Sequence, residues 1–257
     1  MTSKAHSTSA TDPLVLEVDD ATRLFGEVVA LDHVSISARA GEFLTFLGPS
    51  GSGKTTLLRI IAGLDEPTAI RTLKIGGEDV RFLAANKRNV TTVFQHYGLF
   101  PNMSVGENVG FGLMVKRAPE NERRRRSHEL LELMRLPGVY DRRIHQLSAG
   151  QRQRVALARA LAPQPKILLL DEHLAALDER LRHDMQVELK ELQANLGTTF
   201  IYVTHSQEEA LTMSDRVAVL NQGRIVQNDA PSVVFNRPSN CFVADFKIGR
   251  ASCRERV

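Results

Sequence analysis

Short apolar runs alternate with amphipathic segments along most of the chain, which predicts strands alternating with helices. The runs at residues 43–47, 167–172 and 198–204 are almost continuously apolar, so we expect central parallel strands that are buried on both faces. Leu and Met residues recur at helical spacing from Leu181 to Leu196, which predicts a helix with one apolar face. This order of elements favours an α/β fold.

Other predicted strands alternate apolar with polar residues, which is typical of a sheet that has one face in solvent. Residues 14–18, 28–38 and 73–80 show this pattern, and the last reads as a hairpin around a Gly-Gly pair. Together they predict an antiparallel sheet beside the first buried strand. A short strand over 90–94 and a closing hairpin over 216–226 complete the predicted strands.

Helical patterns dominate residues 96–163 and predict an inserted helical subdomain. The clearest predicted helices within it cover residues 119–136 and 150–161. The first of them contains four consecutive arginines, Arg123 to Arg126, which could form a membrane or nucleic-acid patch. Because glutamates surround these arginines, we interpret the run instead as a solvated helix face.

One Gly-rich stretch joins the first buried strand to a short apolar helix, and it fits the pattern G-x-x-x-x-G-K-[ST]. We call it the phosphate-binding loop, and it comprises Gly48, Pro49, Ser50, Gly51, Ser52, Gly53, Lys54, Thr55 and Thr56. The alternative is an ordinary Gly/Ser turn between two core elements. The full pattern between a strand and a helix favours a nucleoside triphosphate site.

The residue types in this loop suit a polyphosphate. Glycines let backbone N–H groups turn toward the phosphates, and the following helix presents its positive N-terminus to them. We predict that Lys54 reaches the β- and γ-phosphates and that the Thr55 hydroxyl ligates Mg²⁺.

At 257 residues, with 42% hydrophobic and 25% charged residues, the chain has the composition of a soluble globular protein of at most two domains. No apolar run approaches the roughly 20 residues that span a bilayer, and residues 1–13 read as a flexible tail. The two cysteines, Cys241 and Cys253, form neither a metal motif nor a disulfide framework, which favours a reducing cytosol.

The formal net charge of +3 lies entirely at the C-terminal end of the chain. Residues 247–257 contain four basic side chains and one acidic side chain, so the rest of the chain is neutral and does not favour a nucleic-acid partner. Residues 248–257 resemble a translated sequencing adaptor. We interpret 247–257 as an artefact in place of the natural continuation, and the alternative is a natural basic tail.

The stretch Leu147-Ser148-Ala149-Gly150-Gln151 narrows the function, because a phosphate-binding loop alone fits kinases, GTPases, helicases and transport ATPases. The stretch closely resembles the signature of ATP-binding cassette (ABC) ATPases. Residues 14–246 resemble the nucleotide-binding domain of a bacterial ABC importer along their whole length. The resemblance implies an α/β fold with a P-loop NTPase (RecA-like) core, an antiparallel β subdomain and a helical subdomain inserted at about 96–163.

The resemblance also implies ATP and Mg²⁺ as cofactors and a role for each matching residue. Phe25 matches the aromatic residue that stacks on adenine. Gln95 matches the glutamine that contacts Mg²⁺ and the γ-phosphate and reports on them to the transmembrane subunits. Asp171 would hold Mg²⁺ through water, and Asp178 matches the aspartate of the D-loop.

Catalysis would depend on Lys54, Gln95, Glu172 and His205. Glu172 matches the general base for the attacking water, and His205 matches the switch histidine that touches the γ-phosphate. Each has an ordinary alternative, because a histidine alone is more often a core or surface residue and an Asp-Glu pair is commonly just solvated. Their joint occurrence at the ends of buried strands favours ATP hydrolysis.

In this family two cassettes bind head to tail, so Ser148, Gly150 and Gln151 would contact ATP held by a second copy of the chain. The sequence departs from the usual pattern at four positions, with Ala149 for Gly, His173 for Pro or Ser, Ala175 for Ser and Ser206 for Asp. None of these changes removes a primary catalytic group.

Further stretches, such as 93–101 and 207–216, resemble importers of polyamines, ferric iron, sulfate or thiosulfate, and sugars, and most closely the spermidine/putrescine branch. The implied partners are a second copy, two transmembrane permease subunits and, indirectly, a periplasmic or extracellular solute-binding protein, at the cytoplasmic face of the inner membrane. A regulatory β-barrel domain normally follows the cassette in this branch and would be missing here. The alternative classes are a non-transport ABC ATPase and a catalytically silent binding module.

Overall fold

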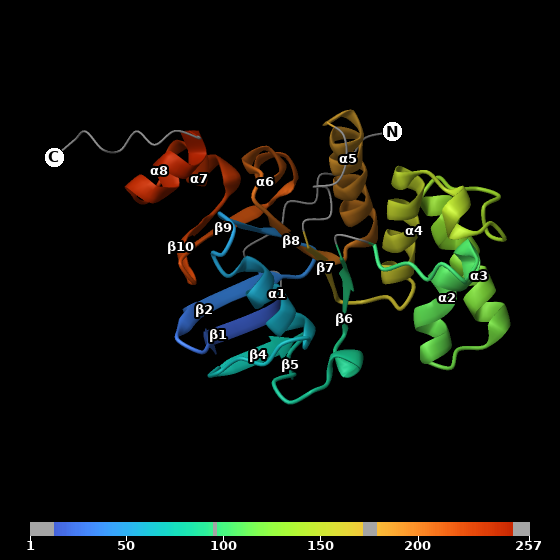
Figure 1. Ribbon diagram of the computed structural model, residues 1–257, viewed down its shortest axis with the longest axis horizontal. Helices are drawn as coiled ribbons and strands as arrows, with labels where there is room; N and C mark the ends of the chain where they lie inside the picture. Colours follow the sequence, from blue (N-terminus) through green and yellow to red (C-terminus); the bar gives the residue numbers. More distant parts are fainter. Residues whose placement is uncertain (1–12, 95–96, 172–178, 249–257) are drawn as a thin grey trace.

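The computed structural model describes residues 13–94, 97–171 and 179–248, which are organised around two sheets (Figure 1). The larger sheet has the strand order β10-β9-β3-β8-β7-β6. Its strands are β3 (Phe43–Leu47), β6 (Val90–Val93), β7 (Ile167–Asp171), β8 (Thr199–Thr204), β9 (Arg216–Asn221) and β10 (Arg224–Asp229). All neighbours pair in parallel except β9 and β10, which form a hairpin. The expected central strands are confirmed, since every residue of β3 and β8 is buried.

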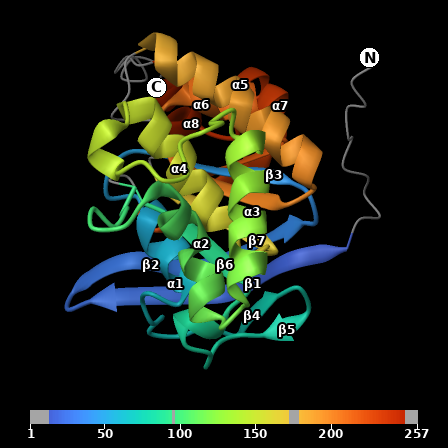
Figure 2. The same ribbon diagram turned by 90° about the vertical axis from the view of Figure 1, so that its right-hand side faces the viewer.

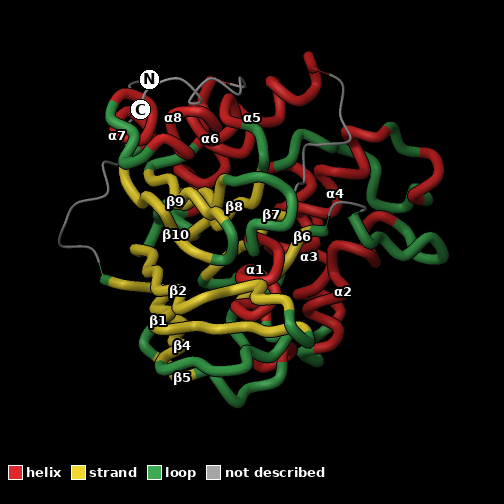
Figure 3. The backbone as a smooth tube through the Cα atoms, turned by 60° about the vertical axis from the view of Figure 1, so that its left-hand side comes forward, coloured by secondary structure: helices red, strands yellow, loops and turns green. Residues whose placement is uncertain are grey.

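The smaller sheet is antiparallel and lies beside the larger one (Figure 3). Its strands, in the order β2-β1-β4-β5, are β1 (Leu14–Phe25), β2 (Val28–Arg39), β4 (Thr72–Ile75) and β5 (Glu78–Asp79). β1 continues seven residues beyond the predicted segment 14–18. The backbone explains the difference: Asp20 and His33 have φ angles of 57° and 51°, so the pairing is irregular there and the apolar alternation is interrupted.

Helices cover both faces of the larger sheet. They are α1 (Lys54–Ala62), α2 (Val105–Val115), α3 (Glu120–Leu133), α4 (Ala149–Leu161), α5 (Glu179–Leu196), α6 (Gln207–Met213), α7 (Pro231–Asn236) and α8 (Cys241–Ile248). Alternate residues of β7 face different helices. Ile167 and Leu169 belong to the core cluster that contains the buried residues of α1, whereas Leu168 and Leu170 belong to the cluster that contains those of α4. The sheet therefore separates α1 from α4.

Helices α2, α3 and α4 pack together beyond β6, within the predicted helical region (Figures 1 and 2). α3 is shorter than the predicted 119–136, because its C-cap is Met134. α7 and α8 have no counterpart in the sequence predictions, and they cover β9 through a small cluster that includes Val234 and Val243. No helix among the described residues is long and apolar enough to cross a membrane.

The C-terminal end of α1 is fixed by Arg88, which lies just before β6. Its guanidinium donates to the carbonyl oxygens of Ile60 at 2.6 Å and Ile61 at 3.1 Å, and also to that of Leu83 at 2.9 Å. Cations near the last carbonyls of a helix are favourable, because these groups have no partner within the helix. α1 is therefore anchored at the end opposite the phosphate-binding loop.

Candidate nucleotide site

The phosphate-binding loop connects the end of β3 to the start of α1, as the sequence predicted. Gly53 is the N-cap of α1 and adopts a left-handed conformation with φ 100°. The Lys54 side chain is almost fully buried, and its Nζ donates to the carbonyl oxygens of Gly48 at 2.9 Å and Pro49 at 2.8 Å. The loop thus folds around the ammonium group, as a cradle for an anionic ligand requires.

Two glycines of the loop are required by close packing. A Cβ at Gly48 would lie 2.3 Å from the carbonyl oxygen of Leu220, and a Cβ at Gly53 would lie 2.5 Å from that of Ala30. A Cβ at Gly51 would meet nothing within 4 Å. The loop therefore presses against β2 and β9 on the protein side and is open at Gly51.

The turn between β9 and β10 supports the loop from behind. The Gly223 N–H donates to the Ser52 carbonyl oxygen at 3.1 Å, and the Asp32 N–H donates to the Gly223 carbonyl oxygen at 2.9 Å. The Ser52 hydroxyl is buried and has no hydrogen-bond partner among the described residues. A buried polar atom inside a Gly-rich loop fits a site that is completed by a polar ligand.

A pair of oxygen donors lies beside the loop. Thr55, at the start of α1, donates from its Oγ1 to Oδ1 of Asp171 at the end of β7, over 3.2 Å. Hydroxyl and carboxylate oxygens are the ligands that Mg²⁺ prefers, commonly with waters between. The two predicted Mg²⁺ residues that the structure describes are thus brought together, and their chemistry fits the ion.

His205 follows β8 directly and is exposed. β8 pairs in parallel with β7, with Val203 opposite Asp171, so His205 lies at the same edge of the sheet as Asp171. Three other predicted site residues, Gln95, Glu172 and Asp178, lie outside the described residues, as do His173 and Ala175.

Phe25 lies at the tip of the β1–β2 hairpin and is 47% exposed. The Arg23 guanidinium lies 4.4 Å from the centre of its ring and also pairs with Asp65 at 2.7 Å. β2 carries Ala30, whose carbonyl oxygen contacts the phosphate-binding loop at Gly53. The hairpin thus holds a partly exposed aromatic ring with the Arg23 guanidinium against it, and adenine stacking by Phe25 stays a prediction.

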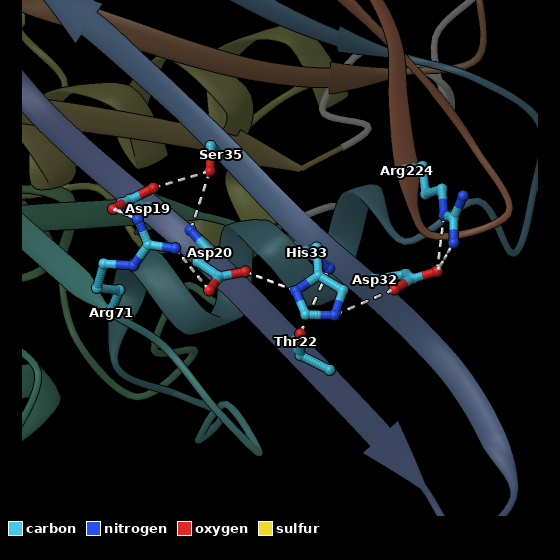
Figure 4. Close-up of polar contacts among 8 residues, drawn as sticks. All are labelled: Asp19, Asp20, Thr22, Asp32, His33, Ser35, Arg71 and Arg224. Atoms are coloured by element: carbon cyan, nitrogen blue, oxygen red, sulfur yellow. Dashed lines mark hydrogen bonds and ion pairs between the residues drawn. The ribbon is translucent and has the colours of Figure 1, made fainter.

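A polar network ties this hairpin to its neighbours (Figure 4). Asp20 lies 2.6 Å from His33 Nδ1 and 3.0 Å from Arg71, while Asp32 lies 2.6 Å from Arg224 of β10. Hydrogen bonds from His33 and then Arg71 hold the pKa of Asp20 below its ordinary value. The network connects β1, β2, the segment before β4 and the β9–β10 hairpin, which supports the phosphate-binding loop.

The signature residues form the N-terminus of α4. Ser148 Oγ accepts from the Gln151 N–H at 3.2 Å, and Gln151 Oε1 accepts from the Ser148 N–H at 3.0 Å, a capping box that fixes the first turn. Ala149 begins the helix, and Gly150 follows it. α4 and α1 lie on opposite faces of the larger sheet, so the signature and the phosphate-binding loop begin helices on different sides of it.

Comparison with known proteins identifies the family. Residues 31–175 match the family described as ABC transporter. This chain belongs to the ABC transporter family. The resemblance inferred from its sequence is confirmed, and the α/β fold with a P-loop core agrees with solved ABC cassettes. Dimeric structures of the ABC cassette MJ0796, one of them in a post-hydrolysis state bound to ADP and Pi, are 33% identical to it, with TM-scores of 0.73 and 0.72. Each alignment covers 84% of this chain and 98% of the cassette.

Curated relatives are still more similar in sequence. The spermidine/putrescine import ATP-binding protein PotA of Mesorhizobium japonicum is 54% identical over 239 residues, which cover 91% of this chain and 65% of that protein. The uncharacterized ABC transporter ATP-binding protein YdcT of Escherichia coli is 53% identical, over 90% of this chain and 68% of that protein. This ABC family member thus spans about 65% of the length of the PotA protein.

Sequence reasoning missed two parts of the site. The support of the loop by Gly223 was not anticipated, because the hairpin turn was interpreted only as a chain reversal. Glu209, in the first turn of α6, was not considered, yet it is buried and accepts hydrogen bonds from Tyr202 and Thr204. The available signal was its position shortly after His205, but glutamate in a first helical turn is commonly exposed.

We expect Gly53→Ala to damage the loop more than Gly51→Ala. Both residues have positive φ angles, which cost an L-residue about 1–2 kcal/mol, but only Gly53 also meets backbone atoms. Urea denaturation should show a free energy of unfolding lower by about 2–5 kcal/mol for Gly53→Ala and by about 1–2 kcal/mol for Gly51→Ala. Equal losses would contradict the packing argument.

We expect Asp20→Asn to lower the free energy of unfolding at neutral pH. Because the pKa of Asp20 is depressed in the folded chain, its contribution is present above the ordinary pKa and is lost as the pH falls through the folded value. The gap between variant and wild type should therefore close below about pH 4. Denaturation at several pH values measures it, with Glu27→Gln, an exposed change in the same hairpin, as the control. A gap that is constant with pH contradicts the network.

Proposed function

We propose that this chain is the ATP-hydrolysing subunit of a bacterial ABC importer and works at the cytoplasmic face of the inner membrane. The observation that carries the proposal is the meeting of three groups at one edge of the larger sheet. They are the loop around the buried Lys54, the Thr55–Asp171 oxygen pair at 3.2 Å, and His205 at the end of β8. They supply a cation, ligands for a metal ion and a hydrogen-bond donor. Phosphoryl transfer to water requires all three.

Each residue has a place in the proposed reaction. The phosphate-binding loop and Lys54 hold the triphosphate, while Phe25 stacks on the adenine. Thr55 and Asp171, with Gln95, would hold Mg²⁺, which when bound would neutralise charge on the phosphate oxygens. Glu172 accepts the proton of the attacking water, and the oxygen of that water bonds to the γ-phosphorus as the bond to ADP breaks.

His205 has a different role from Glu172, because it acts as a hydrogen-bond donor. In the proposed reaction it donates a hydrogen bond to the γ-phosphate, whose oxygens carry negative charge in the transition state. Its place at the edge of the sheet beside Asp171 supports this role. The side chain needs a fixed position to do so, because a hydrogen bond to the transition state depends on distance and direction.

The proposed working form is a head-to-tail dimer. Within one chain the larger sheet separates α1 from α4, so Ser148, Gly150 and Gln151 would close over ATP held by a second copy, with Asp178 at the interface between copies. The MJ0796 structures, which are dimeric, support a dimer for a related cassette. Ala149 adds a methyl group to the surface that would approach the phosphates, so we propose that it affects the rate rather than the reaction.

We propose a polyamine as the imported solute, together with two transmembrane permeases and a solute-binding protein as partners. The support is the identity of 50–54% to several PotA proteins, whose name states spermidine/putrescine import. Importers of ferric iron, sulfate or thiosulfate, or sugars are the alternatives within the family. A non-transport ABC ATPase is the alternative outside transport, and the neutral charge of the chain before residue 247 gives no support for a nucleic-acid partner.

We expect Glu172→Gln to abolish Mg²⁺-dependent ATP hydrolysis while leaving ATP-driven dimerisation intact. Loss of a general base costs about 10²–10⁴-fold in rate, whereas the amide preserves the shape of the side chain. Phosphate release and light scattering with and without ATP measure the two properties. Glu179→Gln, an exposed change at the start of α5, is the matched control. Equal turnover in Glu172→Gln and wild type would show that another group is the base.

We expect the tagged chain to co-purify with two multi-span membrane proteins from its native cell. Disruption of its gene should lower uptake of labelled spermidine or putrescine and leave sulfate and sugar uptake unchanged. Loss of one of those other uptakes instead would assign the alternative solute. Recovery with ribosomes or DNA in place of membrane proteins would favour the non-transport ATPase.

A further inference from the structure

A buried carboxylate, that of Glu209, lies four residues after His205. Glu209 is 3% exposed, although it sits in the first turn of α6 next to the exposed Glu208. Burial of a carboxylate is costly unless hydrogen bonds compensate for the lost water. A glutamate held inside the protein at this point therefore needs specific partners, and the partners identify its role.

Both partners come from β8, the strand that ends immediately before His205. Tyr202 donates from its hydroxyl to Glu209 Oε2 over 2.6 Å, and the Thr204 hydroxyl donates to the same oxygen. Thr204 Oγ1 in turn accepts from the Ser206 N–H at 2.9 Å. Thr204 and Ser206, on either side of His205, are therefore linked to the Glu209 carboxylate. Thr204 is linked directly, and Ser206 is linked through the Thr204 hydroxyl.

The other carboxylate oxygen faces a different element. Arg182 of α5 places its Nε 3.9 Å from Glu209 Oε1. α5 begins at Glu179, immediately after residues 172–178, which include the proposed base Glu172. Glu209 therefore lies between α5, which follows the segment that contains Glu172, and β8, which precedes His205.

We propose that Glu209 is the positioning residue of His205. It holds the backbone of residues 204–206 so that the His205 side chain stays at the edge of the sheet beside Asp171. The inference rests on the proposed ATPase function and adds to it a residue that does not touch the nucleotide. Ser206 fits the same arrangement, since its hydroxyl accepts from the Glu209 N–H at the N-cap of α6.

The first test compares turnover among single variants of the full chain. Glu209→Ala should lower kcat for ATP hydrolysis by about 10²-fold, the effect of misplacing a reacting group, with the KM for ATP unchanged because the phosphate-binding loop is intact. Glu209→Gln keeps an oxygen acceptor, so it should lose less than about tenfold. Glu208→Ala is the matched control and should match wild type. A rise in KM with unchanged kcat in Glu209→Ala would overturn the proposal.

The decisive test is a double-mutant comparison. If Glu209 acts only through His205, adding Glu209→Ala to His205→Ala should lower kcat by less than about twofold further. If the two losses multiply, Glu209 supports the fold in general and the proposal is wrong. Should Glu209→Ala fail to fold, Tyr202→Phe allows the same comparison. It removes one hydrogen bond to Glu209 without leaving a cavity, and we expect kcat to fall by about three- to tenfold.

A spectroscopic readout separates this inference from the proposed function. In ¹⁵N-histidine-labelled protein, the His205 signal is the one of eight histidine signals that disappears in His205→Ala. It should shift or broaden in Tyr202→Phe and Glu209→Gln and stay in place in Glu208→Ala. An unmoved signal overturns the positioning role. Absence of hydrolysis in wild type, with the signal moving as expected, would instead overturn the ATPase proposal alone.

Discussion

Parallel pairing of β3, β8 and β7 is the constraint on which the whole site depends. Parallel strands end at the same edge of a sheet, so three buried strands deliver the phosphate-binding loop, His205 and Asp171 to one place. These segments are far apart in the sequence, so the pairing of the strands brings them together. Burial of both faces of the sheet fixes the register, because a shift by one residue would exchange the sides that face α1 and α4.

Much of this arrangement could be predicted from the sequence. Continuous apolar runs identify the buried strands, and the pattern of the phosphate-binding loop specifies a strand before it and a helix after it. The extension of β1 beyond residue 18 could not be predicted, because the irregular pairing near Asp20 interrupts the alternation that marks a strand. Glu209 was also missed, since a glutamate shows its burial only when the tyrosine and threonine that bind it are placed in space.

The larger sheet also divides the chain into two chemical halves. One face carries α1, which follows the phosphate-binding loop, and the other carries α4 and the signature. Ser148 and Gln151 satisfy each other in a capping box, so the N-terminus of α4 is rigid before any ligand or partner arrives. A preformed surface of this kind loses little conformational entropy on association, which would suit the proposed contact with a second copy.

The support of the phosphate-binding loop by Gly223 has a consequence for synthesis of the protein. The loop occupies residues 48–56, but the N–H that holds the Ser52 carbonyl comes from the turn that follows β9. Chains emerge from the ribosome at about 5–20 residues per second, so the loop waits roughly ten to thirty seconds for its last backbone partner. A nascent chain therefore lacks this support of the loop until the turn between β9 and β10 has been made.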